Sequence, residues 1–200
     1  MKLYFTPGAC SFAPHIALRE IDVDVTLEKV DLRTKTTASG EHYTDINPLG
    51  YVPALRLDNG TILTEAVAIL LYIADQKPDT HLIPEDKTPA RYELYKWLAF
   101  TSSELHKGFG PLFNPALTAE ERAIIVGKLN TRFAYIEAYL AGKEYFVNNT
   151  FSIADIYAFV CLGWTGYMQI DMTAYPNIQS FLARIGERNA VKTAYGAEQI

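Results

Sequence analysis

The chain has 200 residues, of which 49% are hydrophobic and 20% charged, and its formal net charge is −5 at pH 7. This composition is typical of a soluble globular protein with a full core. The acidic balance argues against the clustered basic face that binds nucleic acid. The chain also has no apolar run of about 18 residues, so no membrane span is expected.

The first part of the chain alternates between strand-like and helix-like hydrophobic patterns. Asn59-Gly60 is the strongest short signal for a β-hairpin. The expected elements are a strand over 1–5, a helix over 11–20, a strand over 23–32, hairpin strands over 54–57 and 61–63, and a helix over 65–77.

From residue 89 onward the patterns are helical only. We expect helices over 89–107, 119–140, 153–167 and 175–188, followed by a short terminal piece. Ser152 and Asp155 are spaced as a capping box, which marks the start of the third of these helices. The change of period predicts three segments: an N-terminal domain over 1–78, a linker over 79–88 and a helical domain over 89–200.

Cys10 and Cys161 form no Cys-x-x-Cys or zinc spacing, and the histidines are scattered, so no metal site is expected. No apolar signal segment follows the N-terminus. Together these features predict a reduced, cytoplasmic protein. Cys161 lies in an apolar stretch and is expected in the core.

Cys10 follows Pro7-Gly8 and stands just before a helical pattern. Backbone N–H groups at a helix start stabilise a thiolate and can lower a cysteine pKa below its free value of about 8.5. The position therefore suggests sulfur chemistry. The alternative is a small apolar residue packed at a helix start.

Val52-Pro53 and Thr64-Glu65 each allow a structural and a functional interpretation. Val52-Pro53 opens a strand, where proline leaves backbone groups free to pair with an extended ligand; the alternative is a simple edge proline. Thr64 is a plausible N-cap that would place Glu65 in the first helical turn. Alternatively, the free N–H groups there hold a ligand carboxylate, and Glu65 holds an ammonium group.

Ser103, His106 and Lys107 are spaced so that they share one face of an α-helix, with Ala99 on the same stripe. A hydroxyl, an imidazole and an ammonium on an otherwise apolar helix suggest a polar site. The alternative is that His106 is a structural residue whose hydrogen bonds are made within the protein.

Taken together, these motifs resemble the cytosolic glutathione transferases, and in particular their bacterial beta class. The resemblance rests on the segments Pro7-Gly-Ala-Cys10-Ser, Leu49-Gly-Tyr-Val-Pro53, Leu63-Thr-Glu65-Ala, Ser103-Glu-Leu-His106-Lys107-Gly and Phe151-Ser152-Ile-Ala-Asp155. It implies an α/β thioredoxin-like N-terminal domain that binds glutathione and an all-α helical C-terminal domain that supplies the pocket for a second substrate. It also implies a homodimer with glutathione as cosubstrate and no permanently bound cofactor.

The resemblance assigns a role to each matching position. Catalysis would involve Cys10, next to the glutathione sulfur, and His106, which would reach the site from the helical domain. The residues implied in glutathione binding are Cys10, Lys35 for the glycine carboxylate, Val52 with cis Pro53 for the cysteinyl part, Glu65 and Ala66 for the γ-glutamyl end, and Ser103, His106 and Lys107. The second-substrate pocket would be lined by Phe109, Phe113, Trp164 and Tyr167, for each of which a core position is the alternative.

Three positions depart from the family pattern. Phe5 stands where relatives often carry tyrosine, Ala99 replaces an asparagine, and Ala66 lacks a hydroxyl. Each lost neutral hydrogen bond is worth roughly 0.5–1.5 kcal/mol, so we expect weaker glutathione binding. The adjacent Tyr4 cannot substitute for a tyrosine at position 5, because successive strand residues face opposite sides.

The resemblance predicts an enzyme of detoxification that conjugates glutathione to hydrophobic electrophiles. A thiol–disulfide or peroxide reductase acting through Cys10 on the same site competes with this function. A third hypothesis is a non-enzymatic glutathione- or ligand-binding regulatory protein with the same fold. The presence of Cys10, Glu65 and His106 together favours an enzyme.

Overall fold

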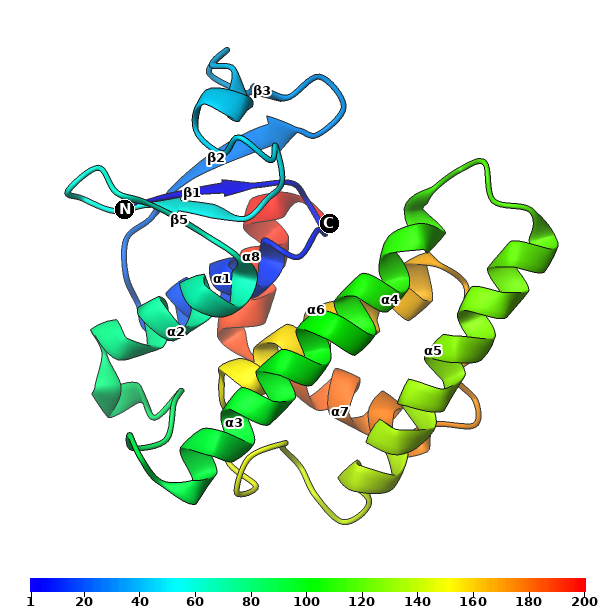
Figure 1. The fold of residues 1–200 in the computed structure, drawn as a ribbon. Helices are drawn as coiled ribbons and strands as arrows, with labels where there is room; N and C mark the ends of the chain where they lie inside the picture. Colours follow the sequence, from blue (N-terminus) through cyan, green and yellow to red (C-terminus); the bar gives the residue numbers. More distant parts are fainter. The chain divides into compact units, whose positions relative to one another are not determined.

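The chain divides into two compact units in the computed structural model, which describes residues 1–200 (Figure 1). The first unit comprises Met1–His81 and Arg188–Ile200, and the second comprises Leu82–Glu187. The terminal helix α8 (Asn189–Glu198) therefore groups with the first unit, whereas the sequence pattern placed it with the helical part. The reason is that α8 packs on α1 (Phe12–Glu20).

A five-stranded sheet forms the centre of the first unit, with the strand order β3-β2-β1-β4-β5. β2 runs parallel to β1, and the other neighbouring strands are antiparallel. The strands are β1 (Lys2–Phe5), β2 (Thr26–Asp31), β3 (Thr36–Thr37), β4 (Ala54–Arg56) and β5 (Ile62–Thr64). The hairpin predicted from Asn59-Gly60 is confirmed as β4–β5.

The helices of the first unit form because apolar residues recur at helical spacing. Ile16 and Ala17 of α1 are fully buried, and so are Ile69 and Ile73 of α2 (Ala66–Gln76). The two helices pack against each other. Short 3₁₀ turns, Tyr43–Asp45 and Pro78–Thr80, complete the connections.

Tyr4 and Phe5 face opposite sides of the sheet, as the alternation predicts. The ring of Tyr4 lies 5.7 Å from the ring of Tyr43, whereas the ring of Phe5 lies 6.4 Å from the imidazole of His15 on α1. Tyr4 is therefore no substitute for a tyrosine at position 5.

The second unit is entirely helical. Its helices are α3 (Pro89–Phe100), a π-helix (Thr101–His106), α4 (Lys107–Phe109), a 3₁₀ turn (Gly110–Phe113), α5 (Ala119–Leu140), α6 (Ile153–Tyr167) and α7 (Pro176–Gly186). The bounds of α5 and α6 are those predicted from the sequence. No helix of the structure combines the length and apolar character needed to cross a membrane.

The centre of the second unit is α6, which packs on α3 and α7. Twelve of its fifteen residues are buried, so the helix is enclosed on most sides by its neighbours. The predicted capping box is confirmed at its start, where the Asp155 carboxylate accepts hydrogen bonds of 2.8 Å from both the N–H and the hydroxyl of Ser152. This cap sets where α6 begins and therefore which residues it presents to its neighbours.

Candidate active site

The strand register gathers six of the predicted site residues at one edge of the sheet. Tyr4 pairs with Ala54, and Ala54 pairs with Thr64, so the end of β1, the start of β4 and the end of β5 coincide. The end of β2 lies at the same edge because β2 is parallel to β1. The predicted site residues in the adjoining segments are Cys10, in the turn after β1, Lys35, just before β3, Val52 and Pro53, just before β4, and Glu65 and Ala66, just after β5. Loops at strand carboxyl ends are a common place for ligands in α/β folds.

Cys10 is a reduced, buried cysteine in the turn before α1. Its Sγ lies 3.1 Å from the carbonyl oxygen of Val52, so the thiol donates a hydrogen bond to that carbonyl. The N–H groups of Phe12 and Ala13 are occupied by the carbonyls of Ala9 and Cys10. These two N–H groups are therefore not available to bond the thiol.

Three consecutive carbonyl groups, those of residues 50–52, accept hydrogen bonds from side chains of the same unit. The donors are Lys35 Nζ to Gly50 at 2.9 Å, Tyr43 Oη and Asn47 Nδ2 to Tyr51 at 2.8 and 2.7 Å, and Cys10 Sγ to Val52. The Val52-Pro53 peptide is cis, as the resemblance implied. The Val52 N–H makes no hydrogen bond to another residue and is open to a ligand.

The hydroxyl of Tyr43, which donates to the Tyr51 carbonyl, is protonated at physiological pH. Burial raises the pKa of its hydroxyl well above the usual value of 10. The group therefore stays protonated and keeps its hydrogen bond to the Tyr51 carbonyl across the physiological pH range.

Glu65 is itself the N-cap of α2, with φ 68° and ψ 120°. The prediction that Thr64 caps this helix and that Glu65 lies in its first turn is therefore wrong, because Thr64 ends strand β5. Glu65 is exposed and its carboxylate makes no capping hydrogen bond. The first N–H groups of α2 thus lack a side-chain cap, and such groups attract an anion. A strained non-glycine residue at this point is a frequent mark of a functional position.

Lys35 is held close to the same edge by its backbone. Its N–H bonds to the Asp31 carbonyl at 2.8 Å, and its own carbonyl accepts from Tyr43 at 2.8 Å. The ammonium lies 5.7 Å from the centre of the Tyr51 ring and retains donors beyond its bond to Gly50. It can therefore accommodate a carboxylate.

In the second unit, the π-helix changes how Ser103, His106 and Lys107 are presented. A π-helix takes roughly one residue more per turn than an α-helix, so residues four apart nearly align and residues three apart do not. Ser103 and Lys107 are exposed, while His106 is half-buried against α6. The interpretation that all three share one face is therefore wrong for His106. Ala99, in α3, is exposed.

His106 has a specific partner in this unit. Its Nδ1 lies 2.7 Å from the hydroxyl of Tyr157, and its ring lies 5.2 Å from the ring of Trp164. Burial, followed by the neighbouring Lys107 charge, lowers the pKa of His106 to about 4. The imidazole is therefore neutral at pH 7. Tyr157 is not among the residues predicted for the site; its spacing of seven residues from Trp164, two turns of α6, was the available signal.

The four aromatic residues expected around a second substrate form one cluster but differ in exposure. The Trp164 ring contacts Phe109 and Phe113 at 5.7 and 5.5 Å, and Phe113 stacks on Tyr167 at 6.4 Å. Phe113 and Tyr167 are 48% and 78% exposed. Phe109 is fully buried between Phe133 and Trp164 and has no surface to offer a ligand.

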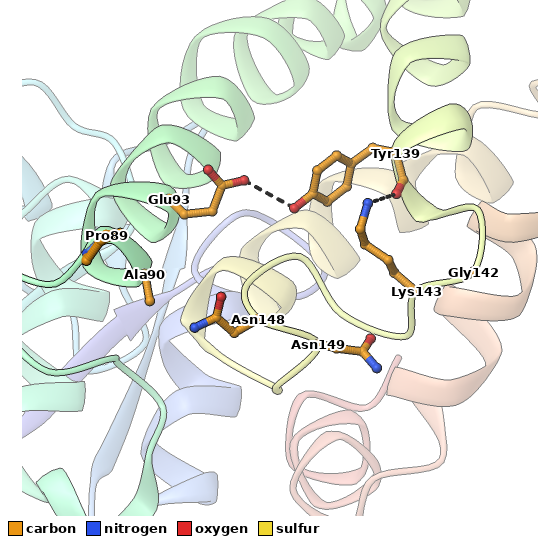
Figure 2. A pocket seen from close by; sticks show the side chains of 8 residues that line it. All are labelled: Pro89, Ala90, Glu93, Tyr139, Gly142, Lys143, Asn148 and Asn149. Carbon is orange, nitrogen blue, oxygen red and sulfur yellow. Dashed lines mark hydrogen bonds between the residues drawn. The ribbon is translucent and has the colours of Figure 1, made fainter.

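A separate cavity of about 530 Å³ lies in the second unit, between the start of α3, the end of α5 and the loop that follows α5 (Figure 2). Its acidic group, Glu93, accepts hydrogen bonds from Trp97 and Tyr139, both at 3.1 Å. Lys143 bonds to the Tyr139 carbonyl at 2.9 Å. None of the predicted site residues lines this cavity. No group of three or more His, Cys, Asp or Glu side chains could hold a metal ion.

Comparisons with known proteins assign both parts of the chain to one family. Residues 1–75 match the family model of the glutathione S-transferase N-terminal domain, and residues 100–189 match that of the C-terminal domain. Glutathione S-transferase GstA of Escherichia coli O157:H7 is 41% identical over 198 residues, which cover 99% of this chain and 98% of that protein.

Solved structures of glutathione transferases are also similar to this chain over nearly its whole length. A ternary complex of BphK, a bacterial glutathione transferase, is 49% identical with a TM-score of 0.97, and all of both chains is covered. A sphingomonad glutathione S-transferase complexed with glutathione is 48% identical with a TM-score of 0.96 and the same coverage. The beta-class enzyme of Sphingomonas chungbukensis is 47% identical over 99% of this chain and 98% of that one, with a TM-score of 0.96. The predicted fold class, a thioredoxin-like domain followed by a helical domain, is confirmed. The chain therefore belongs to the bacterial beta class of the glutathione S-transferase family, and it is a transferase that uses glutathione as its co-substrate.

Proposed function

We propose that this transferase holds glutathione along the sheet edge described above and conjugates it to hydrophobic electrophiles. The observation that carries the proposal is the free backbone N–H of Val52, which lies in sequence between a cation, Lys35, and the uncapped start of α2. Glutathione is an extended tripeptide with a carboxylate at each end. Its backbone can pair with Val52 as an added strand.

Each end of the tripeptide then has a partner. The uncapped N–H groups at Ala66 attract the γ-glutamyl carboxylate, and the exposed Glu65 carboxylate attracts the neighbouring ammonium. Lys35 attracts the glycine carboxylate. This order places the cysteinyl sulfur next to Val52 and Cys10. His106, with Ser103 and Lys107, contributes to the reaction by family resemblance. Phe113 and Tyr167 offer exposed aromatic surface to the electrophile, and Trp164, which is buried, packs against Phe113.

The assignment of Lys35 is tested with a glutathione analogue whose glycine carboxylate is an amide. Wild-type protein should bind the analogue about 10-fold or more weakly than glutathione, because a charge-assisted hydrogen bond is lost. Lys35→Met should bind both ligands alike, whereas Lys29→Met, which removes an exposed lysine from β2, should behave as wild type. An equal penalty for the analogue in wild type and Lys35→Met contradicts the assignment.

A second activity, glutathione-dependent disulfide reduction, is favoured by the reduced Cys10 thiol beside Val52. The Cys10 thiolate would attack oxidised glutathione, forming a mixed disulfide and releasing one glutathione thiolate. Mass spectrometry after incubation with oxidised glutathione should find one glutathionyl group on the Cys10 peptide and none on the Cys161 peptide, since Cys161 is fully buried. Full reductase activity in Cys10→Ala contradicts the role.

We also propose a cytoplasmic homodimer. Two features support this: both cysteines are reduced, and large apolar side chains are exposed, including Leu49 at 67% and Tyr51 at 63%. Light scattering should give twice the mass of the chain. Leu49→Asp should shift the protein toward the monomer, because it places a charge in this exposed apolar loop.

A further inference from the structure

One contact of His106 has no part in the function proposed so far, namely its hydrogen bond with Tyr157. The Nδ1 atom and the phenol oxygen are 2.7 Å apart, and the two rings meet edge to face at 6.0 Å and 89°. Tyr157 is only 1% exposed. The contact is therefore enclosed by protein, where a hydrogen bond is stronger than in water.

The position of Tyr157 is fixed by the helix that carries it. The Ser152–Asp155 capping box sets the start of α6, and Tyr157 lies in the second turn. His106 is the last residue of the π-helix, which packs on α6. Single π segments are common at functional positions because they redirect side chains within a helix. Here the segment ends with the imidazole against Tyr157.

The chemistry of the two groups determines the direction of the hydrogen bond. A phenol is a good O–H donor, and the nitrogen of a neutral imidazole is a better acceptor than a phenol oxygen. When the phenol donates to Nδ1, the single ring proton of a neutral histidine must be on Nε2. The lowered pKa of His106 is consistent with the neutral form.

We propose that Tyr157 is a positioning residue for catalysis: its hydroxyl donates to Nδ1 of His106 and holds the imidazole in the tautomer that carries its proton on Nε2. The proposal rests on the proposed role of His106 in the transferase reaction. In this tautomer Nε2 is a hydrogen-bond donor, the form that stabilises an anion such as a thiolate. It is not the free lone pair that a general base needs to accept the glutathione proton.

The tautomer is tested first by ¹⁵N NMR of wild-type protein labelled at histidine. The His106 signals are assigned from their loss in His106→Gln. We expect a protonated Nε2 and an unprotonated Nδ1. His15 is an internal reference with the opposite tautomer, because its Nδ1 faces the Glu198 carboxylate at 2.8 Å and its Nε2 accepts from Arg19 at 3.2 Å. A protonated Nδ1 on His106 overturns the proposal without any variant having to fold.

The positioning role is tested kinetically in the full-length protein with Tyr157→Phe, which removes only the hydroxyl. We expect kcat for conjugation to fall about 10-fold while KM for glutathione stays within about 2-fold, because a misoriented donor acts on the transition state more than on binding. The matched control is Tyr139→Phe, which removes a hydroxyl whose proton is shared between the Phe146 carbonyl at 2.7 Å and the Glu93 carboxylate at 3.1 Å, elsewhere in the unit. The control should keep the wild-type kcat at similar thermal stability.

A third comparison separates failure of this inference from failure of the proposed function. His106→Gln places an amide N–H near the position of Nε2, and His106→Asn places one near Nδ1, so His106→Gln should keep more activity. If His106→Ala has wild-type activity, the proposed role of His106 fails. If His106→Ala is impaired but Tyr157→Phe keeps the wild-type kcat, or loses activity only in proportion to its unfolded fraction, the inference about Tyr157 fails.

Discussion

The ammonium of Lys35 lies 2.9 Å from the carbonyl oxygen of Gly50, and the backbone of Gly50 has φ 64°. A Cβ atom at position 50 would lie 3.0 Å from Cδ of Lys35 and 3.3 Å from its Nζ. The glycine thus provides both the turn and the space in which the lysine side chain lies. The conformation of one residue therefore controls where the cation of the other is placed.

Gly50→Ala should therefore impair glutathione binding by moving Lys35. We expect KM for glutathione to rise several-fold, and the left-handed backbone should cost about 1–2 kcal/mol of unfolding free energy. Gly60→Ala is the matched control, because Gly60 has φ 87° and no atom within 4 Å of its Cβ position. It should lose comparable stability in urea unfolding and keep its KM. A KM increase of the same size in both variants would rule out a specific effect on Lys35.

Glu198 connects three segments of the first unit, and we expect its removal to be costly. Its carboxylate contacts Nδ1 of His15 at 2.8 Å and accepts the Gly8 N–H at 3.2 Å, and both side chains of the pair are fully enclosed. Glu198→Ala removes the buried carboxylate that pairs with His15 and accepts the Gly8 N–H, which should lower the free energy of unfolding by about 3 kcal/mol. Glu41→Ala, which removes an exposed carboxylate of the same unit, should change it by less than about 0.5 kcal/mol in the same urea titrations.

His106 should make stability depend on pH in a defined direction. Its pKa in the folded chain is about 4, below the ordinary value of 6.5, because burial disfavours the charged imidazole. Between these two values the unfolded chain binds a proton that the folded chain does not. Stability therefore rises with pH over this interval, and the contribution is lost as pH falls. The unfolding free energy of wild type minus that of His106→Gln, measured by urea unfolding, should increase by about 2–3 kcal/mol from pH 4 to pH 7. A flat difference would mean that the folded chain accepts the proton as readily as the unfolded one.

Much of the fold could be predicted from local sequence signals. The bounds of α5 and α6, the β4–β5 hairpin and the capping box at Ser152 all follow from helical periodicity, Asn-Gly and side-chain capping. Strand β3 was missed because it has two residues, Thr36 and Thr37, and no apolar alternation. The place of α8 beside α1 depends on contacts between residues nearly two hundred positions apart, such as His15 with Glu198, which no local pattern reveals.

The candidate site was predictable where a residue type defines it and less so where the backbone does. Cys10 was identified by its chemistry and Lys35 by the family resemblance; Cys10 lies in the turn after β1, and Lys35 lies between β2 and β3. The positive φ of Glu65 and the π-helix before Lys107 have no clear sequence signal, so the predicted cap at Thr64 and the predicted common face of Ser103 and His106 were wrong. Tyr157 resembles the apolar residues around it on α6, and only its contact with His106 gives it a polar role.

Asp155 should produce a pH dependence opposite in sign to that of His106. The carboxylate is fully buried and accepts hydrogen bonds from the N–H of Phe146 and from the N–H and hydroxyl of Ser152, at 2.8–2.9 Å. Burial disfavours the charged form more than these donors stabilise it, and it raises the pKa of Asp155 from 3.8 to about 7. Between these values the folded chain binds a proton that the unfolded chain releases. The stability that Asp155 contributes is therefore complete below about pH 4 and decreases as pH rises toward 7.

Asp155→Asn isolates this effect, because the amide has nearly the same shape and does not titrate. The unfolding free energy of wild type minus that of Asp155→Asn should fall by up to about 4 kcal/mol between pH 4 and 7, a span set by about three pKa units. Ser152→Ala is the companion variant; it weakens the cap by about 1 kcal/mol and leaves a titrating carboxylate in place. If the difference between wild type and Asp155→Asn is constant with pH, Asp155 stays ionised throughout, and the three donors stabilise its charge more than burial disfavours it.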